Sequence, residues 1–264
     1  MTETLSLRAK IEQSPMGAYQ WMIVVMAAIM NLLDGFDVLA LAFTATAIRG
    51  EFGLTGIELG YLLSAGLFGM TAGSLFLAPL ADKIGRRPLL LMAVSLSAIG
   101  MLGSAFISQY QWLGFWRVIT GLGVGGILVG TNVITSEYSS RKWRSFAISV
   151  YAAGFGIGAV LGGMFAVMLQ GEYGWRSVFL AGAILTALLL EILFIWLPES
   201  IDFLTSKQPK NAEVRLNLIA KKIGLAGDWK LPAKVEKVKS KLPISQLFSE
   251  KYLHSTLLIW TAFF

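Results

Sequence analysis

Residues 31–37 read Asn-Leu-Leu-Asp-Gly-Phe-Asp, and they lie in the middle of an apolar run that covers residues 19–48. A helix needs about 20 apolar residues to cross a bilayer, so this run predicts a membrane span. A carboxylate at that depth costs about 3 kcal/mol unless it is paired or protonated, which makes Asp34 and Asp37 candidates for a functional site. Asn31 lies one helical turn before Asp34 and is a candidate for hydrogen bonding to a substrate or a carboxylate.

The composition excludes a soluble domain. The chain has 264 residues, of which 55% are hydrophobic and only 14% are charged. It contains no cysteine and one histidine, His254, so a thiolate site, a disulfide framework and a multi-histidine metal site are all excluded. No nucleophile paired with a base is visible either. We therefore expect a polytopic helical membrane protein that needs no metal or cofactor and is not an enzyme.

Six runs are long enough to cross a bilayer, and a seventh begins near the end of the chain. The six spans are Tyr19 to Ile48, Ile57 to Leu80, Pro88 to Ile107, Trp112 to Ser136, Phe146 to Gln170, and Trp175 to Leu197. The last run, 253–264, is too short to cross. We expect residues 19–197 to form a six-helix bundle and the chain to be the front part of a longer protein whose C-terminal half is missing.

Lysine and arginine in the connections predict the orientation. Of the 22 lysines and arginines, only Arg49 and Arg176 are in connections on the side of the membrane opposite to the N-terminus. Arg117 lies inside a span. The others precede the first span or follow the second, fourth and sixth. Residues 1–18 and the linker 198–252 are therefore expected to be cytoplasmic. Because the basic residues are scattered among loops, they indicate topology and not a nucleic-acid surface.

The linker has one patterned segment. Val214, Leu218, Ile219 and Ile223 are separated by basic residues, which predicts a short amphipathic helix at the inner membrane surface. A solvated linker fits the same residues.

The connection between the second and third spans has an unusual composition for a simple loop. It contains Asp82, Gly85, Arg86 and Arg87, and a turn at Gly85 would let the arginines reach an acid such as Glu137 at the inner end of span four. Together with Arg144, these residues are predicted to form an ionic latch, a set of ion pairs that holds one conformation of the molecule. The alternative is that the charges only set the topology.

Glycines are concentrated in spans four and five. Those in span four match the G-x-G-x-x-G dinucleotide pattern, but no strand precedes them and no acid follows at the required distance. Small residues at helical spacing instead let a neighbouring helix approach closely. The glycines concerned are Gly121, Gly123 and Gly126 in span four and Gly154, Gly158 and Gly162 in span five.

Helix geometry places Arg117 near the two carboxylates. At 1.5 Å per residue, Asp37 lies about 27 Å from the inner end of span one, and Arg117 lies about 8 Å below the outer end of span four. In a core about 30 Å thick, these depths are similar. We expect Arg117 to face Asp37 or Asp34, because a carboxylate beside a guanidinium satisfies two otherwise costly groups. Such a carboxylate can also exchange a proton as its surroundings change.

These motifs resemble those of the major facilitator superfamily. The loop that ends Asp82-Lys83-Ile84-Gly85-Arg86-Arg87 is similar to its G-x-x-x-D-[RK]-x-G-R-[RK] signature, with Ala78 in place of the first glycine. The segment 117–126 resembles the R-x-x-x-G-x-G-x-G-G signature of its fourth helix. Residues 34–37 look like the D-G-x-D of the aromatic acid:proton symporter family, and residues 197–204 look like the end of helix six in related members.

The resemblance implies an all-α membrane protein with a six-transmembrane-helix N-terminal bundle, built as two inverted three-helix repeats. It implies proton-coupled uptake of a small aromatic carboxylate, benzoate-like or hydroxybenzoate-like, across a cell inner membrane. Antiporters of the superfamily usually carry Gly-Pro where this chain has Gly158-Ala159, which favours symport or uniport. A sugar, polyol or other organic-acid carrier of the same superfamily remains an alternative, as does a receptor or scaffold that does not transport.

Overall fold

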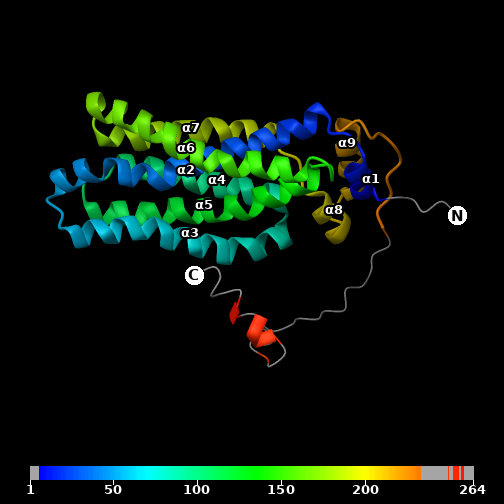
Figure 1. Ribbon diagram of the computed structural model, residues 1–264, viewed down its shortest axis with the longest axis horizontal. Helices are drawn as coiled ribbons and strands as arrows, with labels where there is room; N and C mark the ends of the chain where they lie inside the picture. The colour runs from blue at the N-terminus through cyan, green and yellow to red at the C-terminus, as the bar shows by residue number, and fades with distance from the viewer. Residues whose placement is uncertain (1–5, 233–248, 250–251, 256, 259–264) are drawn as a thin grey trace. The chain divides into compact units, whose positions relative to one another are not determined.

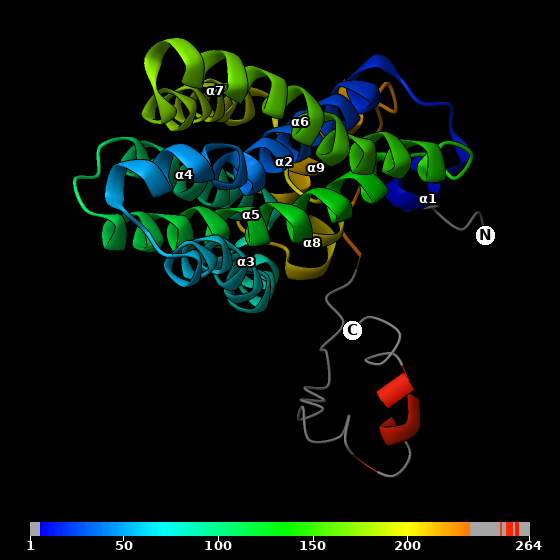
Figure 2. The same ribbon diagram turned by 60° about the vertical axis from the view of Figure 1, so that its left-hand side comes forward.

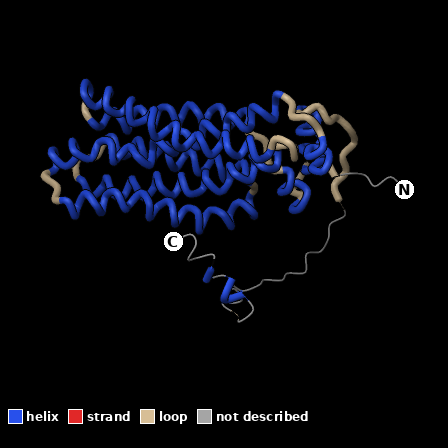
Figure 3. The backbone as a smooth tube through the Cα atoms, viewed as in Figure 1, coloured by secondary structure: helices blue, strands red, loops and turns tan. Residues whose placement is uncertain are grey.

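The computed structural model describes residues 6–232, 249, 252–255 and 257–258. The chain divides into two compact units, Met1–Leu231 and Pro232–Phe264. Most of the predicted seventh run lies outside the described residues. The described part contains helices and loops but no strand (Figure 3).

The described part of the first unit contains six long helices and three short ones (Figure 1). The six long helices have the length and composition of membrane spans, so the predicted bundle is confirmed. They are α2 (Ala18–Phe52), α3 (Gly56–Ile84), α4 (Arg86–Ala105), α5 (Tyr110–Tyr138), α6 (Arg144–Tyr173) and α7 (Trp175–Trp196). The short ones are α1 (Leu7–Gln13), α8 (Ile201–Lys207) and α9 (Ala212–Lys222).

Local sequence sets the ends of the long helices. Gly53 ends α2 in the left-handed conformation, with φ of 62°. Thr55 then begins α3 through a capping box: its hydroxyl accepts from the backbone N–H of Glu58, and the Glu58 carboxylate accepts from the backbone N–H of Thr55. Gly85 separates α3 from α4 with φ of 105°, a conformation that strongly favours glycine. These turns make neighbouring helices antiparallel.

The helices pack in pairs, α2 against α6 and α3 against α5, while α4 contacts both α5 and α7 (Figure 2). In the most apolar stretch of α2 and of α5, 61% of the residues are buried. In the corresponding stretch of α3 and of α6, only 17% of the residues are buried. The exposed residues of α3 and α6 include many large apolar side chains. These two helices therefore present broad apolar faces that suit lipid or another bundle.

Glycines bring the paired helices into backbone contact, as the sequence predicted. A Cβ on Gly158 would lie 1.8 Å from the carbonyl oxygen of Leu32, and one on Gly35 would lie 2.1 Å from that of Phe155. Gly121 of α5 approaches α3 in the same way. All three contacts are shorter than any side chain allows, so glycine is required for the observed packing of α2 on α6 and of α5 on α3.

Replacing Gly158 with alanine is expected to lower the thermal unfolding midpoint of the purified protein, because the added methyl group overpacks a backbone contact at a cost of about 1–3 kcal/mol. The matched control is Gly156→Ala on the same helix, where a Cβ would meet nothing within 4 Å. That variant is expected to be neutral or stabilising by up to about 1 kcal/mol, since alanine favours helix more than glycine. Equal midpoints for the two variants would contradict the packing described here.

The short helices α1, α8 and α9 lie together at one end of the bundle (Figures 1 and 2). Their buried side chains Leu7, Leu204 and Leu216 belong to one apolar cluster that also contains residues of α2, α4, α5 and α7. The helix predicted in the linker is confirmed as α9, whereas its place at the inner membrane surface stays a prediction. Its apolar residues are not all buried. Ile219 is buried in the cluster, whereas Val214 and Leu218 are exposed.

Candidate functional site

Arg117 is buried inside the bundle, with 3% of its surface exposed. Its Nη2 donates to the hydroxyl of Ser104 at 3.0 Å and to that of Thr120 at 2.9 Å, and its Nη1 donates to the backbone carbonyl of Asp37 at 3.4 Å. The guanidinium carbon also lies 4.8 Å from the centre of the Phe179 ring. Contacts from α2, α4, α5 and α7 therefore fix one cation in the apolar interior.

Asp37 lies beside Arg117, but its carboxylate has a different partner. The hydroxyl of Ser97, on α4, donates a short hydrogen bond to Oδ2 of Asp37. Among the described residues, no ion pair joins Arg117 to Asp37 or Asp34. The expected pairing of carboxylate and guanidinium is thus replaced by a contact through the Asp37 carbonyl, because Ser97 draws the carboxylate toward α4.

Asp34 and Asn31 are also buried, with 1% and 3% of their surfaces exposed. The amide of Asn31 donates to the carbonyl of Tyr151 on α6 at 2.8 Å. No described residue donates to Oδ1 of Asn31, Oδ2 of Asp34 or Oδ1 of Asp37. Buried oxygens without a donor are costly, and such groups in native proteins generally serve a function or bind water or an ion.

A small cavity opens beside this group, between α2, α3 and α5. Asp37, Arg117 and Thr120 supply its polar wall, and the rest of its lining is largely apolar, with Leu41, Leu62, Leu63, Leu67, Met70 and Val124. Its volume is about 40 Å³. Typical small-molecule sites measure roughly 300–1,000 Å³, so these residues form one wall of a site and not a complete one.

The residues predicted to form a latch lie at the other end of α3 and α4. Asp82 and Arg86 form an ion pair at 2.7 Å on either side of Gly85. The carboxylate of Glu199, which follows α7, accepts from the backbone N–H groups of Arg86 at 2.8 Å and Arg87 at 3.1 Å. Glu199 therefore caps the start of α4, where a negative charge is favourable.

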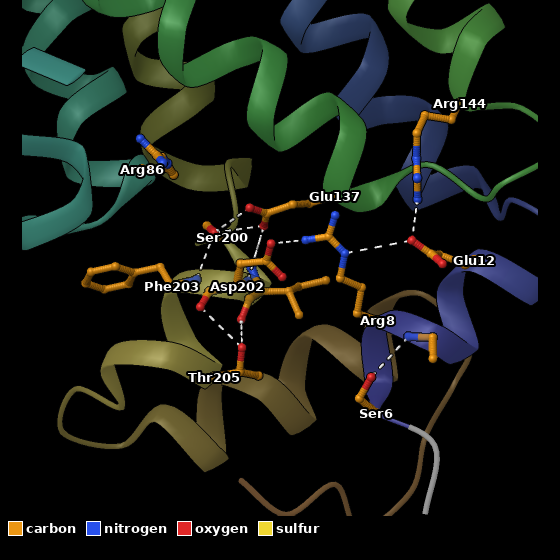
Figure 4. A network of polar contacts seen from close by, with 12 residues as sticks. Ser6, Arg8, Glu12, Arg86, Glu137, Arg144, Ser200, Asp202, Phe203 and Thr205 are labelled. Atoms are coloured by element: carbon orange, nitrogen blue, oxygen red, sulfur yellow. Dashed lines mark hydrogen bonds and ion pairs between the residues drawn. The ribbon is translucent and has the colours of Figure 1, made fainter. Parts of the chain in front are cut away.

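Glu137, at the end of α5, caps another helix in a similar way. Its carboxylate accepts from the hydroxyl of Ser200 and from the backbone N–H of Ile201 at 2.9 Å, so it caps the start of α8 (Figure 4). The neighbouring Tyr138 donates to the carbonyl of Glu199 at 2.6 Å. Glu137 is not in an ion pair with Arg86, Arg87 or Arg144 within the described part of the chain.

Arg144 pairs with the N-terminal helix instead. Its Nη2 lies 2.7 Å from the carboxylate of Glu12 on α1 (Figure 4). Arg8, also on α1, pairs with Asp202 at the start of α8. The predicted latch residues thus belong to two clusters, one at the α3–α4 turn and one around α1 and α8. Sequence reasoning missed α1, whose seven residues contain only two buried apolar side chains, Leu7 and Ile11.

The Glu12–Arg144 pair predicts a pH dependence. The hydrogen bond from Arg144 is the main reason that the pKa of Glu12 is below its usual value of 4.5. A carboxylate with a lowered pKa contributes stability above that usual value, and the contribution is lost as pH falls below it. Glu12→Gln is therefore expected to lower the thermal unfolding midpoint at pH 7 and to have a smaller effect near pH 3. The same difference from the unsubstituted protein at both pH values would contradict this role.

No group of three or more His, Cys, Asp or Glu side chains able to hold a metal occurs among the residues that the structure describes. The central site therefore offers a buried cation, two buried carboxylates and apolar walls. This arrangement can bind an organic anion and exchange a proton.

Comparison with known proteins identifies the family. Residues 27–264 match the family model described as the Major Facilitator Superfamily. The chain belongs to this superfamily. In the family's terms, α2 to α7 form one six-helix half. The fold of this major facilitator chain is also similar to that of the proton:xylose symporter XylE, with a TM-score of 0.71, 22% identity, and coverage of 80% of this chain and 50% of that chain.

Two curated relatives share more sequence with this major facilitator chain. The gallate transporter of Pseudomonas putida is 34% identical over 254 residues, which make up 96% of this chain and 57% of that protein. The 4-hydroxybenzoate transporter PcaK of the same organism is 32% identical over 265 residues, 99% of this chain and 59% of that protein. The chain therefore spans somewhat more than half the length of the curated relatives it matches.

Proposed function

We propose that this chain forms one half of a transporter that couples proton entry to the uptake of a small aromatic carboxylate. The observation that carries the proposal is the buried group of Arg117, Asp37 and Asp34 beside an apolar cavity. A fixed guanidinium attracts an organic anion, and apolar walls favour its ring. Relatives named for gallate and 4-hydroxybenzoate support the substrate class. The substrate crosses chemically unchanged.

A second bundle is part of the proposal. The cavity is far smaller than a typical ligand site, and α3 and α6 present large exposed apolar faces. Alternating access in this type of fold arises from the movement of one bundle against the other around a site at the membrane midplane. The relatives' greater length supports the same arrangement.

The proton is carried by a carboxylate of α2 in this account. We assign the coupling role to Asp37, because it lines the cavity and lies beside Arg117. Asp34 hydrates the site or orients the substrate, and the amide of Asn31 holds α2 against α6 next to it. The neutral form of Asp37 permits reorientation of the loaded carrier, and the charged form follows release of the proton inside.

The charged clusters at the other end serve as the conformational latch. The Asp82–Arg86 pair and the caps made by Glu199 and Glu137 connect α3, α4, α5 and α8. Their release would free that end of the bundle to open. The distribution of lysine and arginine supports a cytoplasmic location for this end, with residues 1–18 and 198–252 on the same side of an inner membrane.

Uptake measurements test the proposal. The full-length transporter, reconstituted in vesicles with an inward proton gradient, is expected to accumulate radiolabelled 4-hydroxybenzoate, benzoate or gallate, and an uncoupler is expected to abolish accumulation. Excess unlabelled aromatic acid should compete, whereas xylose and polyols should not. Competition by a sugar or polyol would favour a different carrier of the superfamily, and a complete lack of uptake of every substrate class would favour a receptor or scaffold.

A further inference from the structure

A second cavity lies at the end of the bundle that carries α8 and α9, away from the transport site. It lies between the start of α2, the start of α4, the end of α7 and the outer face of α9. Its volume is about 400 Å³, which is within the range of roughly 300–1,000 Å³ for small-molecule sites. Its size and lining make it a candidate binding site of its own.

The cavity carries a net positive charge. Arg87, Arg215 and Lys222 line it, and the one acidic residue in the lining is Glu199. One oxygen of Glu199 already accepts from the backbone N–H groups of Arg86 and Arg87. The negative charge of Glu199 is thus balanced by the start of α4, while no ion pair involving Arg215 or Lys222 occurs within the described residues.

The basic side chains come from one face of α9. Arg215, Leu218 and Lys222 follow one another at spacings of three and four residues, so they project from the same side of the helix. The adjoining side packs into the apolar cluster through Leu216 and Ile219, and Ile219 also lines the cavity. Leu218 nevertheless remains 56% exposed. A helix that is buried on one face and presents both an apolar residue and two cations on the other is suited to a membrane surface.

Aromatic residues mark the cavity as interfacial. The ammonium of Lys222 lies 5.3 Å from the centre of the Tyr19 ring, and the Tyr19 hydroxyl donates to the carbonyl of Trp196 at 3.4 Å. Tyrosine and tryptophan with one polar and one apolar end are typical of the level of lipid headgroups. A cavity lined by such residues suits the level at which headgroup phosphates lie.

An apolar track leads away from the cavity along α7. Ile195 lines the cavity and is 69% exposed, and Ile192 and Leu188 continue the same side of the helix at 49% and 52%. Their spacing of three and four residues forms a continuous stripe. A stripe of this kind suits an acyl chain that begins at the cavity and runs into the bilayer.

We propose that this cavity binds the headgroup of an anionic phospholipid, with its phosphate between Arg215, Lys222 and Arg87 and an acyl chain along the exposed face of α7. Basic pockets between membrane helices next to the bilayer surface suit such headgroups. The adjoining apolar stripe favours a lipid over free phosphate, because free phosphate gains nothing from apolar surface. The bound lipid would connect α9 to α4 and α7.

The test uses the purified chain in detergent and native mass spectrometry, with dioleoylphosphatidylglycerol as the anionic probe and dioleoylphosphatidylcholine as the neutral one. Phosphatidylglycerol is expected to bind about tenfold more tightly. The double variant Arg215→Gln/Lys222→Gln should remove this preference. Both residues are exposed, and circular dichroism checks that the variant is folded.

The matched control is Lys221→Gln/Lys207→Gln, which removes the same charge from α8 and α9 at positions that do not line the cavity. It should keep the preference for phosphatidylglycerol. The proposal would be overturned if both double variants lost the preference for phosphatidylglycerol to the same extent. It would also be overturned if Arg215→Gln/Lys222→Gln kept that preference unchanged. Displacement of the lipid by an equal concentration of inorganic phosphate would overturn the assignment to a lipid.

Discussion

Replacement of Arg117 with lysine is expected to reduce aromatic acid uptake by the full-length transporter about a hundredfold, which corresponds to about 2.7 kcal/mol. Lysine keeps the charge but has a single ammonium nitrogen, whereas two nitrogens of Arg117 reach Ser104, Thr120 and the Asp37 carbonyl. Lysine also lacks the planar group that lies against Phe179. The measurement is initial uptake of radiolabelled substrate at equal amounts of transporter in the membrane.

The control for this prediction is Arg176→Lys. Arg176 makes an ion pair with Glu51 at 2.8 Å, and both side chains are about 40% exposed. Exposed pairs contribute roughly 0–1 kcal/mol, so this variant should retain most of the uptake. If Arg117→Lys transports as well as Arg176→Lys, the guanidinium geometry described here is not needed for function.

Asp37→Asn is expected to lose accumulation against a gradient while retaining exchange of labelled for unlabelled substrate across de-energised membranes. Asparagine keeps the size of the side chain and can accept from Ser97, but it cannot carry a proton. The loaded carrier can still reorient, because the neutral amide resembles the protonated carboxyl. The final ratio of internal to external substrate should then be about one, as expected without proton coupling.

The variant Asp34→Asn distinguishes the roles of the two carboxylates. If Asp37 carries the proton, Asp34→Asn should still accumulate substrate, at a lower rate or with a weaker affinity. Loss of both accumulation and exchange in Asp37→Asn would assign that residue to substrate binding or helix packing instead. Loss of accumulation in Asp34→Asn alone, with exchange intact, would transfer the coupling role to Asp34.

The sequence predicted the membrane helices because their signal is local. A run such as 19–48 is too long and too apolar to be anything except a span, and α2 covers it completely. The central charged residues could also be found from sequence, since a charge in an apolar run is costly. The glycine contacts followed from helical spacing, and Gly158 and Gly121 do lie against neighbouring backbones.

The partners of these residues could not be predicted in the same way. Ser97 and Ser104 are common residues in apolar helices, and only the three-dimensional packing of α4 against α2 and α5 places them beside Asp37 and Arg117. Glu199 belonged to a motif noticed only by resemblance, and its role as a helix cap depends on the path of the chain after α7. Charge and spacing identify a candidate residue, but its partner depends on tertiary structure.

The charges near α1 and α8 illustrate the same limit. The sequence grouped Glu137 and Arg144 in one latch because both lie near the inner ends of spans. In the structure, Glu137 binds the start of α8 and Arg144 binds Glu12 of α1. Helix α1 is too short to give a periodic signal, so its role as a partner became visible only from its packing.

Substrate-driven proton movement tests the central claim most directly. Vesicles that contain the full-length transporter, without a membrane potential and at pH 7.5, are mixed with 4-hydroxybenzoate while the external pH is recorded in a weak buffer. Benzoate-like acids are almost fully ionised at this pH, so the external alkalinisation reports carrier-mediated proton entry. The account predicts clear alkalinisation with the unsubstituted protein and none with the double variant Asp34→Asn/Asp37→Asn. Equal alkalinisation with both proteins would contradict it.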